Sequence, residues 1–255
     1  MSARVVSGKG WTLFEGDCLD VMPTLDRVDH VITDPPYEAE AHTQMRRVKR
    51  PGHVISVEPL SFSPITEDQR VSSSREMARL ARRWTLVFCQ VEASAAWRDA
   101  LEEAGAVYRR TCVWVKPDGQ PQLSGDRPGM GYESIVAMHA CGRSSWNGGG
   151  KTGVFTHNKY EGRGRPNEHP TTKPLALMLE LVALFTDPGE TILDPFTGSG
   201  STGVACLRLG RKFIGIERDE KYFELACERL RAEESGSTLT ARRAGQEPLF
   251  RKAGT

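Results

Sequence analysis

The hydrophobic positions of the chain form short apolar runs that alternate with amphipathic stretches. The runs are rich in β-branched and aromatic residues, which predicts buried strands, and the stretches between them repeat apolar residues at helical spacing. The predicted strands cover residues 11–14, 29–33, 84–89, 107–115, 133–139, 191–194 and 212–216, and the predicted helices end near residues 22, 83, 104, 185, 209 and 232. This alternation predicts a single doubly wound α/β domain over residues 1–235.

Three stretches lack a steady hydrophobic period. Residues 38–73 hold three prolines and a basic run, and the helix after them is predicted to begin at Ser74. Residues 141–168 are rich in glycine, serine and basic residues, with three aromatic residues between them. Long irregular loops in compact domains are usually functional lids or disordered segments. Aromatic residues among basic ones suit contact with nucleic acid, and they suit a surface loop nearly as well. Residues 236–255 are polar and predict a flexible tail.

Composition and charge fit a globular protein without a membrane span. Of the 255 residues 38% are hydrophobic and 26% are charged, and the net charge is +1. No apolar run reaches membrane-spanning length and residues 1–11 hold no apolar signal core, so a cytoplasmic protein is expected. The six cysteines are scattered without a Cys-x-x-Cys pair. This spacing argues against a zinc site, against any other metal site with cysteine ligands and against a disulfide framework.

A stiff turn follows the apolar run at residues 29–33. Asp34 is followed there by Pro35, Pro36 and Tyr37. Two prolines cannot continue a sheet ladder, so the strand ends and the acid and the tyrosine are held at its C-terminal edge. In an open parallel sheet that edge is where ligands bind. Turn statistics alone fit an ordinary strand-ending turn equally well.

A glycine-rich loop follows the predicted strand at residues 191–194. Gly198–Gly203 fits G-x-G-x-x-G, and Glu217 stands at the end of the next strand. This arrangement is typical of a nucleoside-cofactor site, in which the glycines allow close approach and the acid takes the ribose hydroxyls. Asp194, directly before the loop, would repel a pyrophosphate and attract an ammonium group. The local charge therefore favours S-adenosylmethionine over a dinucleotide.

Three motifs in this order resemble the β class of the amino-methylating DNA methyltransferases. They are Asp34–Tyr37, His169–Pro174 and Asp194–Gly200, and shorter stretches between Trp114 and Glu133 are similar to the family's middle section. The resemblance covers roughly residues 11–230. It implies a Rossmann-like methyltransferase fold with a seven-stranded, mostly parallel sheet that has one antiparallel strand.

The resemblance also implies how S-adenosylmethionine would be held. Phe196 and the glycine loop would line its methionine part, and Thr171 and Lys173 would lie by its carboxylate. Glu217 would take the ribose hydroxyls, and Asp17 would lie near the adenine. The expected cofactor contacts are Asp17, Thr171, Lys173, Asp194, Phe196, Gly198, Ser199, Gly200, Ser201, Thr202 and Glu217.

The catalytic residues implied by the resemblance are Asp34, Pro35, Pro36 and Tyr37. Asp34 and the Pro35 carbonyl would accept hydrogen bonds from the exocyclic amine of a flipped base in double-stranded DNA, and Tyr37 would stack on that base. Adenine N6 is the expected target, because the family's cytosine-N4 members more often have serine where Asp34 stands. Cytosine N4 is the alternative.

Other activities are less favoured. The chain has no Pro-Cys dipeptide, which argues against methylation of cytosine carbon 5 by a cysteine nucleophile. A nicotinamide-dependent oxidoreductase could be built on the same glycine pattern. A methyltransferase for RNA or a protein amide, and an inactive DNA-binding module, remain further alternatives.

Two basic clusters are candidate contacts to DNA phosphates, although a solvated surface loop explains either of them. The first lies in the segment 38–73, expected to be a lid, and the second in the segment 141–168, where the family keeps its target-recognition segment. The candidates are Arg46, Arg47, Lys49, Arg50, Lys151, Lys159, Arg163 and Arg165. In the tail, Gln246–Phe250 resembles the peptide by which bacterial proteins dock on the sliding clamp. A homodimer and a restriction-enzyme partner are further open options.

Overall fold

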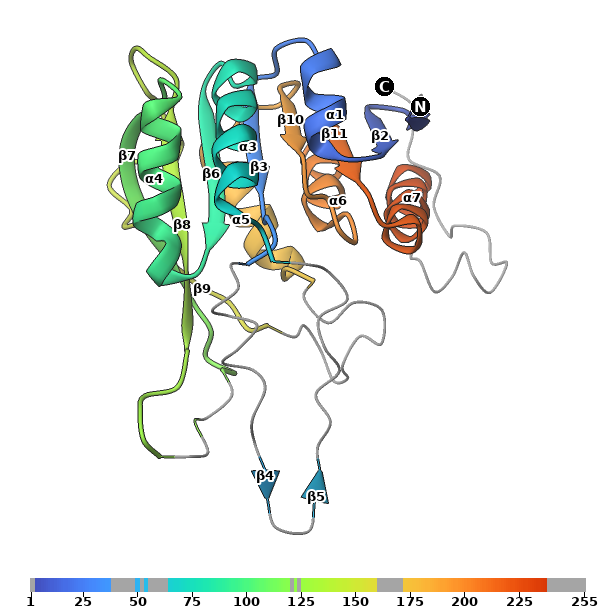
Figure 1. Ribbon diagram of the computed structural model, residues 1–255. Helices are drawn as coiled ribbons and strands as arrows, with labels where there is room; N and C mark the ends of the chain where they lie inside the picture. The colour runs from blue at the N-terminus through green and yellow to red at the C-terminus, as the bar shows by residue number, and fades with distance from the viewer. Residues whose placement is uncertain are drawn as a thin grey trace.

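A nine-stranded sheet forms the centre of the molecule (Figure 1). The computed structural model describes residues 3–37, 49–50, 53–54, 64–119, 122, 125–159 and 172–237. The strand order is β1-β2-β11-β10-β3-β6-β8-β7-β9. In chain order the strands are β1 (Arg4–Gly8), β2 (Trp11–Glu15), β3 (His30–Thr33), β6 (Trp84–Cys89), β7 (Val107–Val115), β8 (Tyr132–His139), β9 (Val154–Thr156), β10 (Thr191–Asp194) and β11 (Lys212–Glu217).

The predicted seven strands form the central part of this sheet, but the predicted count is wrong. From β2 to β7 all neighbours run parallel except β8, which is antiparallel to both β6 and β7. Two edge strands are added: β1 pairs antiparallel with β2, and β9 pairs parallel with β7. Neither carries a run of buried apolar residues, since β1 is largely exposed and β9 buries only Phe155. The hydrophobic pattern therefore could not indicate them.

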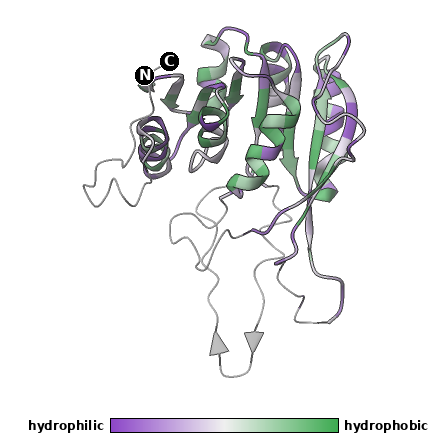
Figure 2. Ribbon diagram, turned by 180° about the vertical axis from the view of Figure 1, so that it is seen from behind, coloured by the Kyte–Doolittle hydropathy of each residue, from purple (hydrophilic) through white to green (hydrophobic). Residues whose placement is uncertain are grey.

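Helices cover both faces of the sheet. One face is covered by α1 (Cys18–Val21), α3 (Glu67–Leu80) and α4 (Ser94–Glu103), and the other by α5 (Leu175–Phe185), α6 (Ser201–Arg208) and α7 (Glu220–Ser235) (Figure 1). Two short 3-10 turns adjoin these helices: η1 (Met22–Thr24) follows α1, and η2 (Val91–Ala93) leads into α4. Strand residues alternate between the two apolar layers, so that Val31 packs under α1 and α3 while Ile32 faces the other layer. The apolar centre lies between the more polar outer sides of the helices (Figure 2). No helix in the described part of the chain is both long and apolar enough to span a bilayer.

Helix α3 begins earlier than predicted. Thr66 caps it, because the Thr66 hydroxyl accepts a hydrogen bond from the Gln69 amide at 3.2 Å and the Gln69 side chain accepts one from the Thr66 amide at 3.0 Å. This reciprocal pair is a capping box. Ser73 and Ser74 are buried in the helix instead of capping it. The predicted irregular segment at residues 38–73 is therefore helical from Glu67 onward.

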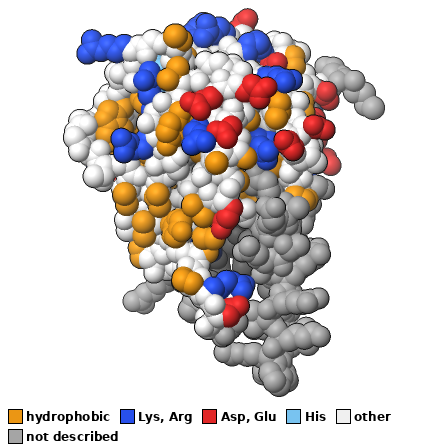
Figure 3. All heavy atoms as spheres, turned by 60° about the vertical axis from the view of Figure 1, so that its left-hand side comes forward, with side chains coloured by type: hydrophobic (Ala, Val, Ile, Leu, Met, Phe, Trp, Pro, Cys, Tyr) orange, Lys and Arg blue, Asp and Glu red, His pale blue; other side chains and the backbone are white. Residues whose placement is uncertain are grey.

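The edge formed by β7, β8 and β9 carries exposed apolar side chains. Among the described residues the large apolar side chains of Met130, Tyr132 and Val154 are 41–50% exposed. Apolar side chains gather on the lower part of this side of the molecule, whereas charged residues of both signs cover the upper part (Figure 3).

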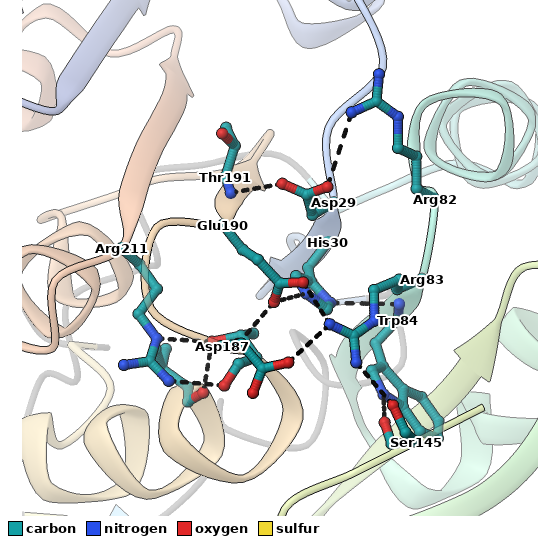
Figure 4. Close-up of polar contacts among 12 residues, drawn as sticks. Asp29, His30, Arg82, Arg83, Trp84, Ser145, Asp187, Glu190, Thr191 and Arg211 are labelled. Atoms are coloured by element: carbon teal, nitrogen blue, oxygen red, sulfur yellow. Dashed lines mark hydrogen bonds and ion pairs between the residues drawn. The ribbon is translucent and has the colours of Figure 1, made fainter.

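A polar network ties together the N-terminal ends of the central strands (Figure 4). His30 is fully buried, and its Nε2 lies 2.7 Å from the Glu190 carboxylate. The Trp84 amide donates to His30 Nδ1 at 3.4 Å, so Nε2 carries the proton and donates to Glu190. Arg83 pairs with both Glu190 and Asp187. Burial lowers the pKa of His30 below its usual value although Glu190 opposes the shift.

Candidate active site at the C-terminal edge of the sheet

A cavity of about 200 Å³ lies at the edge where β2, β3, β10 and β11 end. β10 and β3 are parallel neighbours with Leu193 opposite Val31, so the turns that follow them are adjacent. The Thr33 hydroxyl donates to Asp194 Oδ1 at 2.7 Å and joins the turns. The lining residues are Gly16–Leu19, Asp34–Tyr37, Pro64, Ile65, Gln69, Ser73, Lys173, Asp194–Ser199, Ser201, Thr202, Ile216–Asp219 and Tyr222.

The glycine loop adopts a conformation that side chains would disturb. Gly198 and Gly200 have φ angles of 52° and 82°, which are unfavourable for residues with a Cβ atom. Gly200 caps α6 and packs on Ala226 of α7, and it is not among the lining residues. A Cβ atom on Gly203 would lie 2.6 Å from the Phe213 ring. The first two glycines of the pattern thus shape the loop, and the third brings α6 against β11.

Asp194 binds both ends of the glycine loop by hydrogen bonds. Its side chain is buried and accepts hydrogen bonds from the hydroxyls of Thr33 and Thr202, both at 2.7 Å, and from the Phe196 amide at 3.2 Å. Burial raises the pKa of Asp194 to about 6, against the effect of these hydrogen bonds. Asp194 therefore lines the cavity as expected, with three donors already bound to it.

Two further carboxylates lie at the ends of β2 and β11. Glu217 Oε2 accepts a hydrogen bond from the Gly198 amide at 2.7 Å, and Oε1 accepts one from the Asp219 amide at 2.8 Å. Asp17 caps α1 by accepting the Leu19 amide at 2.9 Å. The Gly198 amide, the first of the loop, already donates to Glu217. A pyrophosphate would need this N–H as a free donor and would meet a carboxylate there.

Asp34 and Lys173 form an ion pair at the cavity. Lys173 Nζ lies 2.5 Å from Asp34 Oδ2, whereas Asp34 Oδ1 is buried and accepts no hydrogen bond from the described residues. Burial raises the pKa of Asp34, and the ammonium group of Lys173 opposes this shift. Sequence reasoning placed Lys173 by the cofactor carboxylate. In the structure its ammonium group faces Asp34, and Lys173 also lines the cavity. Thr171, expected to act with it, lies outside the described residues.

The candidate DNA contacts are only partly within the described chain. Lys151 pairs with Glu180, which also binds His157 at 2.6 Å, and the Lys159 amide donates to Asp118 at 2.7 Å. β4 (Lys49–Arg50) pairs with β5 (His53–Val54) in a separate small sheet. Outside the described residues lie Arg46, Arg47, Arg163, Arg165 and the predicted clamp peptide Gln246–Phe250.

The aromatic residues of the segment 141–168 serve the core. Phe155 is 1% exposed, and the ring of Trp146 packs against Phe185 with a centroid distance of 5.5 Å. Burial leaves Phe155 no surface for contact with nucleic acid, whereas Trp146 is only partly buried against the core. Tyr160 lies outside the described residues.

Helix α3 supplies lining residues that sequence reasoning missed. Gln69 and Ser73 face the cavity one helical turn apart, and the Ser73 hydroxyl is buried with no hydrogen-bond partner among the described residues. The signal in the sequence was the Thr66–Gln69 capping box, which places Gln69 and Ser73 on one face of a helix.

Comparison with known proteins identifies the family. A sequence model of the N6_N4_Mtase family, described as DNA methylase, matches residues 28–228. The chain belongs to this family of DNA methylases. The match contains the Asp34 turn, the Lys173 segment and the glycine loop. These segments build the cavity.

Relatives of similar length support the assignment. The methylase is 29% identical over 241 residues to the Escherichia coli (strain K12) protein YubD, a match that covers 86% of this chain and 89% of YubD. It is 28% identical over 231 residues to the type II methyltransferase M2.DpnII of Streptococcus pneumoniae, covering 82% of this chain and 84% of that protein.

Solved structures share the fold. A complex of M1.HpyAVI with SAM matches with a TM-score of 0.65 and 26% identity, over 86% of this chain and 98% of that one. The cytosine-N4-specific PvuII DNA methyltransferase matches with a TM-score of 0.67 over 94% of each chain. At 14% identity the second likeness concerns the fold alone.

Proposed function

We propose that this methylase transfers a methyl group from S-adenosylmethionine to the exocyclic N6 amine of a flipped adenine in double-stranded DNA. The observation that carries the proposal is Asp34, which lines the same cavity as the glycine loop and whose Oδ1 accepts no hydrogen bond from the described residues. A hydrogen-bond acceptor is thereby available next to a site for a nucleoside cofactor.

The cavity has carboxylate acceptors that suit S-adenosylmethionine, and this is the cofactor of the family. Asp194 and Glu217 place two carboxylates beside the loop, and Asp17 adds a third at the end of β2. They suit an ammonium group and ribose hydroxyls. The same carboxylates disfavour a dinucleotide, because Glu217 already binds the Gly198 amide. Calorimetry separates the two readings: we expect S-adenosylmethionine to bind and a nicotinamide dinucleotide to give no heat.

The residues of the catalytic turn would act on the amine nitrogen. When bound, S-adenosylmethionine supplies a sulfonium methyl group that reacts by in-line displacement. Asp34 Oδ1 and the Pro35 carbonyl would each accept a hydrogen bond from the amine, which favours a pyramidal nitrogen and stabilises its developing positive charge. Pro36 stiffens the turn, and Tyr37, which lines the cavity, would stack on the base. A base inside a duplex cannot reach this cavity, so it must flip out.

Identification of the modified nucleoside tests the target. Purified protein is incubated with DNA and S-adenosylmethionine, and the digested nucleosides are separated by mass. N6-methyladenine is the expected product. Formation of N4-methylcytosine alone would refute adenine as the target and move the same mechanism to the cytosine amine, because both reactions need the two acceptors. 5-methylcytosine, or no modified base, would contradict the proposal.

DNA binding is proposed to involve the basic residues of both irregular segments. The candidates other than Lys151 are Arg46, Arg47, Lys49, Arg50, Lys159, Arg163 and Arg165. Each phosphate contact releases a counterion, so the affinity should fall steeply with salt. Titration of a fluorescent duplex at several salt concentrations measures the slope, and a flat response would count against these contacts.

Docking of the tail on a sliding clamp is a separate proposal. Gln246–Phe250 places a glutamine before an apolar pair, which suits a peptide-binding groove. We expect purified clamp to retain the full chain on a column and to lose it when residues 246–255 are deleted. Retention of the shortened chain would exclude this role.

A further inference from the structure

Four charged side chains form a row that begins in the turn 34–37, where Asp34 is 26% exposed, and runs into the protein. In order they are Asp34, Lys173, Glu133 and Lys116, and their charges alternate in sign. Lys173 Nζ lies 2.5 Å from Asp34 Oδ2 and 3.3 Å from Glu133 Oε2, and Lys116 pairs with Glu133 Oε1. The side chains of Lys173, Glu133 and Lys116 are 9–11% exposed. Removal of one charge from such a row leaves its neighbour buried and uncompensated.

The topology of the sheet brings the row together. β8 runs antiparallel between β6 and β7, so Glu133 at its start lies at the edge where the parallel strands end. Glu133 is opposite Trp114 in the ladder, and Lys116 follows β7 directly. Strand β8, the one antiparallel strand among β2 to β7, thus places the carboxylate of Glu133 at the same edge of the sheet as the cavity.

Aromatic rings replace water around the ammonium group of Lys173. Its Nζ lies 5.1 Å from the centroid of Phe88, 5.7 Å from that of Tyr37 and 5.9 Å from that of Trp114. Cation–π contacts of this length stabilise a desolvated ammonium group. Asp34 and Glu133 raise the pKa of Lys173 well above its usual value although burial opposes the shift, and the two lysines hold the pKa of Glu133 at about 2 against its burial. Lys173 and Glu133 are therefore held in their charged forms, whereas burial raises the pKa of Asp34 and lowers that of Lys116.

We propose that Lys173, held in place by Glu133 and Lys116, is a positioning residue that fixes Asp34 Oδ2 and thereby presents Oδ1 as an ionised acceptor to the substrate amine. The inference rests on the proposed function of Asp34. It assigns Lys173 to the catalytic carboxylate, whereas the family resemblance implies a place by the cofactor carboxylate. The charged or titratable groups facing Asp34 are Lys173, Glu133, Lys116, Tyr37 and Asp194.

Two substitutions in the row should change the titration of Asp34 in opposite directions. Lys173→Met removes the positive charge that lowers the pKa of Asp34, so this pKa should rise. Glu133→Gln removes a negative charge that raises this pKa, so the pKa should fall. General damage to the fold would not produce opposite shifts.

The titration can be followed without turnover. The full chain is labelled with carboxyl-¹³C aspartate, and the Asp34 signal is assigned by its loss in Asp34→Ala. We compare the midpoints of wild type, Lys173→Met and Glu133→Gln. Lys212→Met and Glu103→Gln are matched controls, because both side chains are exposed and lie away from the cavity, and their midpoints should equal that of wild type.

Kinetics and calorimetry complete the test. Both variants of the row should lower kcat by about tenfold or more, and the acid limb of the pH–rate profile should follow the shifted midpoint. Their Kd for S-adenosylmethionine should stay within about threefold of wild type. An unmoved midpoint together with a large loss of cofactor affinity in Lys173→Met would overturn the proposal and place Lys173 at the cofactor.

The remaining outcomes are also decisive. If Lys173→Met does not fold, Glu133→Gln decides alone, and an unmoved midpoint there overturns the proposal. If wild type methylates no base while the midpoints shift as expected, the row is present and the proposed function is wrong.

Discussion

Asp194→Asn should stabilise the fold at high pH while weakening cofactor binding. Asp194 is 2% exposed, and burial raises its pKa from an ordinary 3.8 to about 6. Asparagine keeps the shape of the side chain. Its oxygen can accept from Thr33 and the Phe196 amide, and the Thr202 hydroxyl can rotate to accept from its nitrogen.

The expected magnitude follows from linkage. A difference of about two pKa units between the folded and unfolded states corresponds to about 3 kcal/mol. Because the folded pKa is the higher one, this stability is present below pH 4 and is lost as the pH rises through 6. About half of it is already lost at pH 5, so about 1.4 kcal/mol disappears between pH 5 and pH 8. Asparagine does not ionise and avoids this loss.

Urea unfolding at pH 5 and at pH 8 measures the effect. The difference in unfolding free energy between Asp194→Asn and wild type should change by about 1.4 kcal/mol in favour of the variant at the higher pH. Asp99→Asn on the exposed surface of α4 is the matched control and should show no such change. Equal pH dependence of Asp194→Asn and wild type would refute the raised pKa of Asp194. Calorimetry should show cofactor affinity reduced about tenfold or more, because a negative charge has left the cavity.

Two other substitutions test the cavity and the opposite edge of the sheet. Glu217→Ala frees the Gly198 amide and removes the ribose acceptor, so the Kd for S-adenosylmethionine should rise about 10- to 100-fold by calorimetry; an unchanged Kd would exclude Glu217 from the site. His30→Gln removes a buried imidazole whose pKa is lowered by burial. Because the unfolded chain binds a proton at this histidine more readily than the folded chain, His30 lowers the free energy of unfolding as the pH falls below about 6.5. The loss of unfolding free energy from pH 7 to pH 5 should therefore be shallower in the variant, by up to about 1.4 kcal/mol per pH unit, and parallel curves would contradict this role.

The parts of the fold that could be predicted depend on local pattern. Strands β6, β7 and β10 have the predicted bounds, because each is rich in β-branched or aromatic residues and lies between turn residues. Asp34 and Asp194 could be placed together because the C-terminal ends of parallel neighbours share one edge. The early start of α3 was missed, because serine is usual both at caps and in loops and the Ser72–Ser74 run was interpreted as a cap.

The partner of Lys173 could not be predicted from local pattern. Lys173 and Asp34 are 139 positions apart, and their contact depends on how α5 and β3 pack. Glu133 and Lys116 stand in stretches that resemble the family, but their charge compensation appears only when β8 is inserted between β6 and β7. Strand neighbours of this kind are set by tertiary packing and leave no periodic signal along the chain.

The most direct test of the account is a single-turnover experiment with Asp34→Ala. Enzyme in excess over a DNA duplex is mixed with methyl-labelled S-adenosylmethionine, and label in the base amine is followed in time. The account predicts a rate at least about 100-fold below wild type, because the acceptor for the amine is gone, with a cofactor Kd within about threefold of wild type. Methyl transfer to the base amine at the wild-type rate would contradict the role of Asp34.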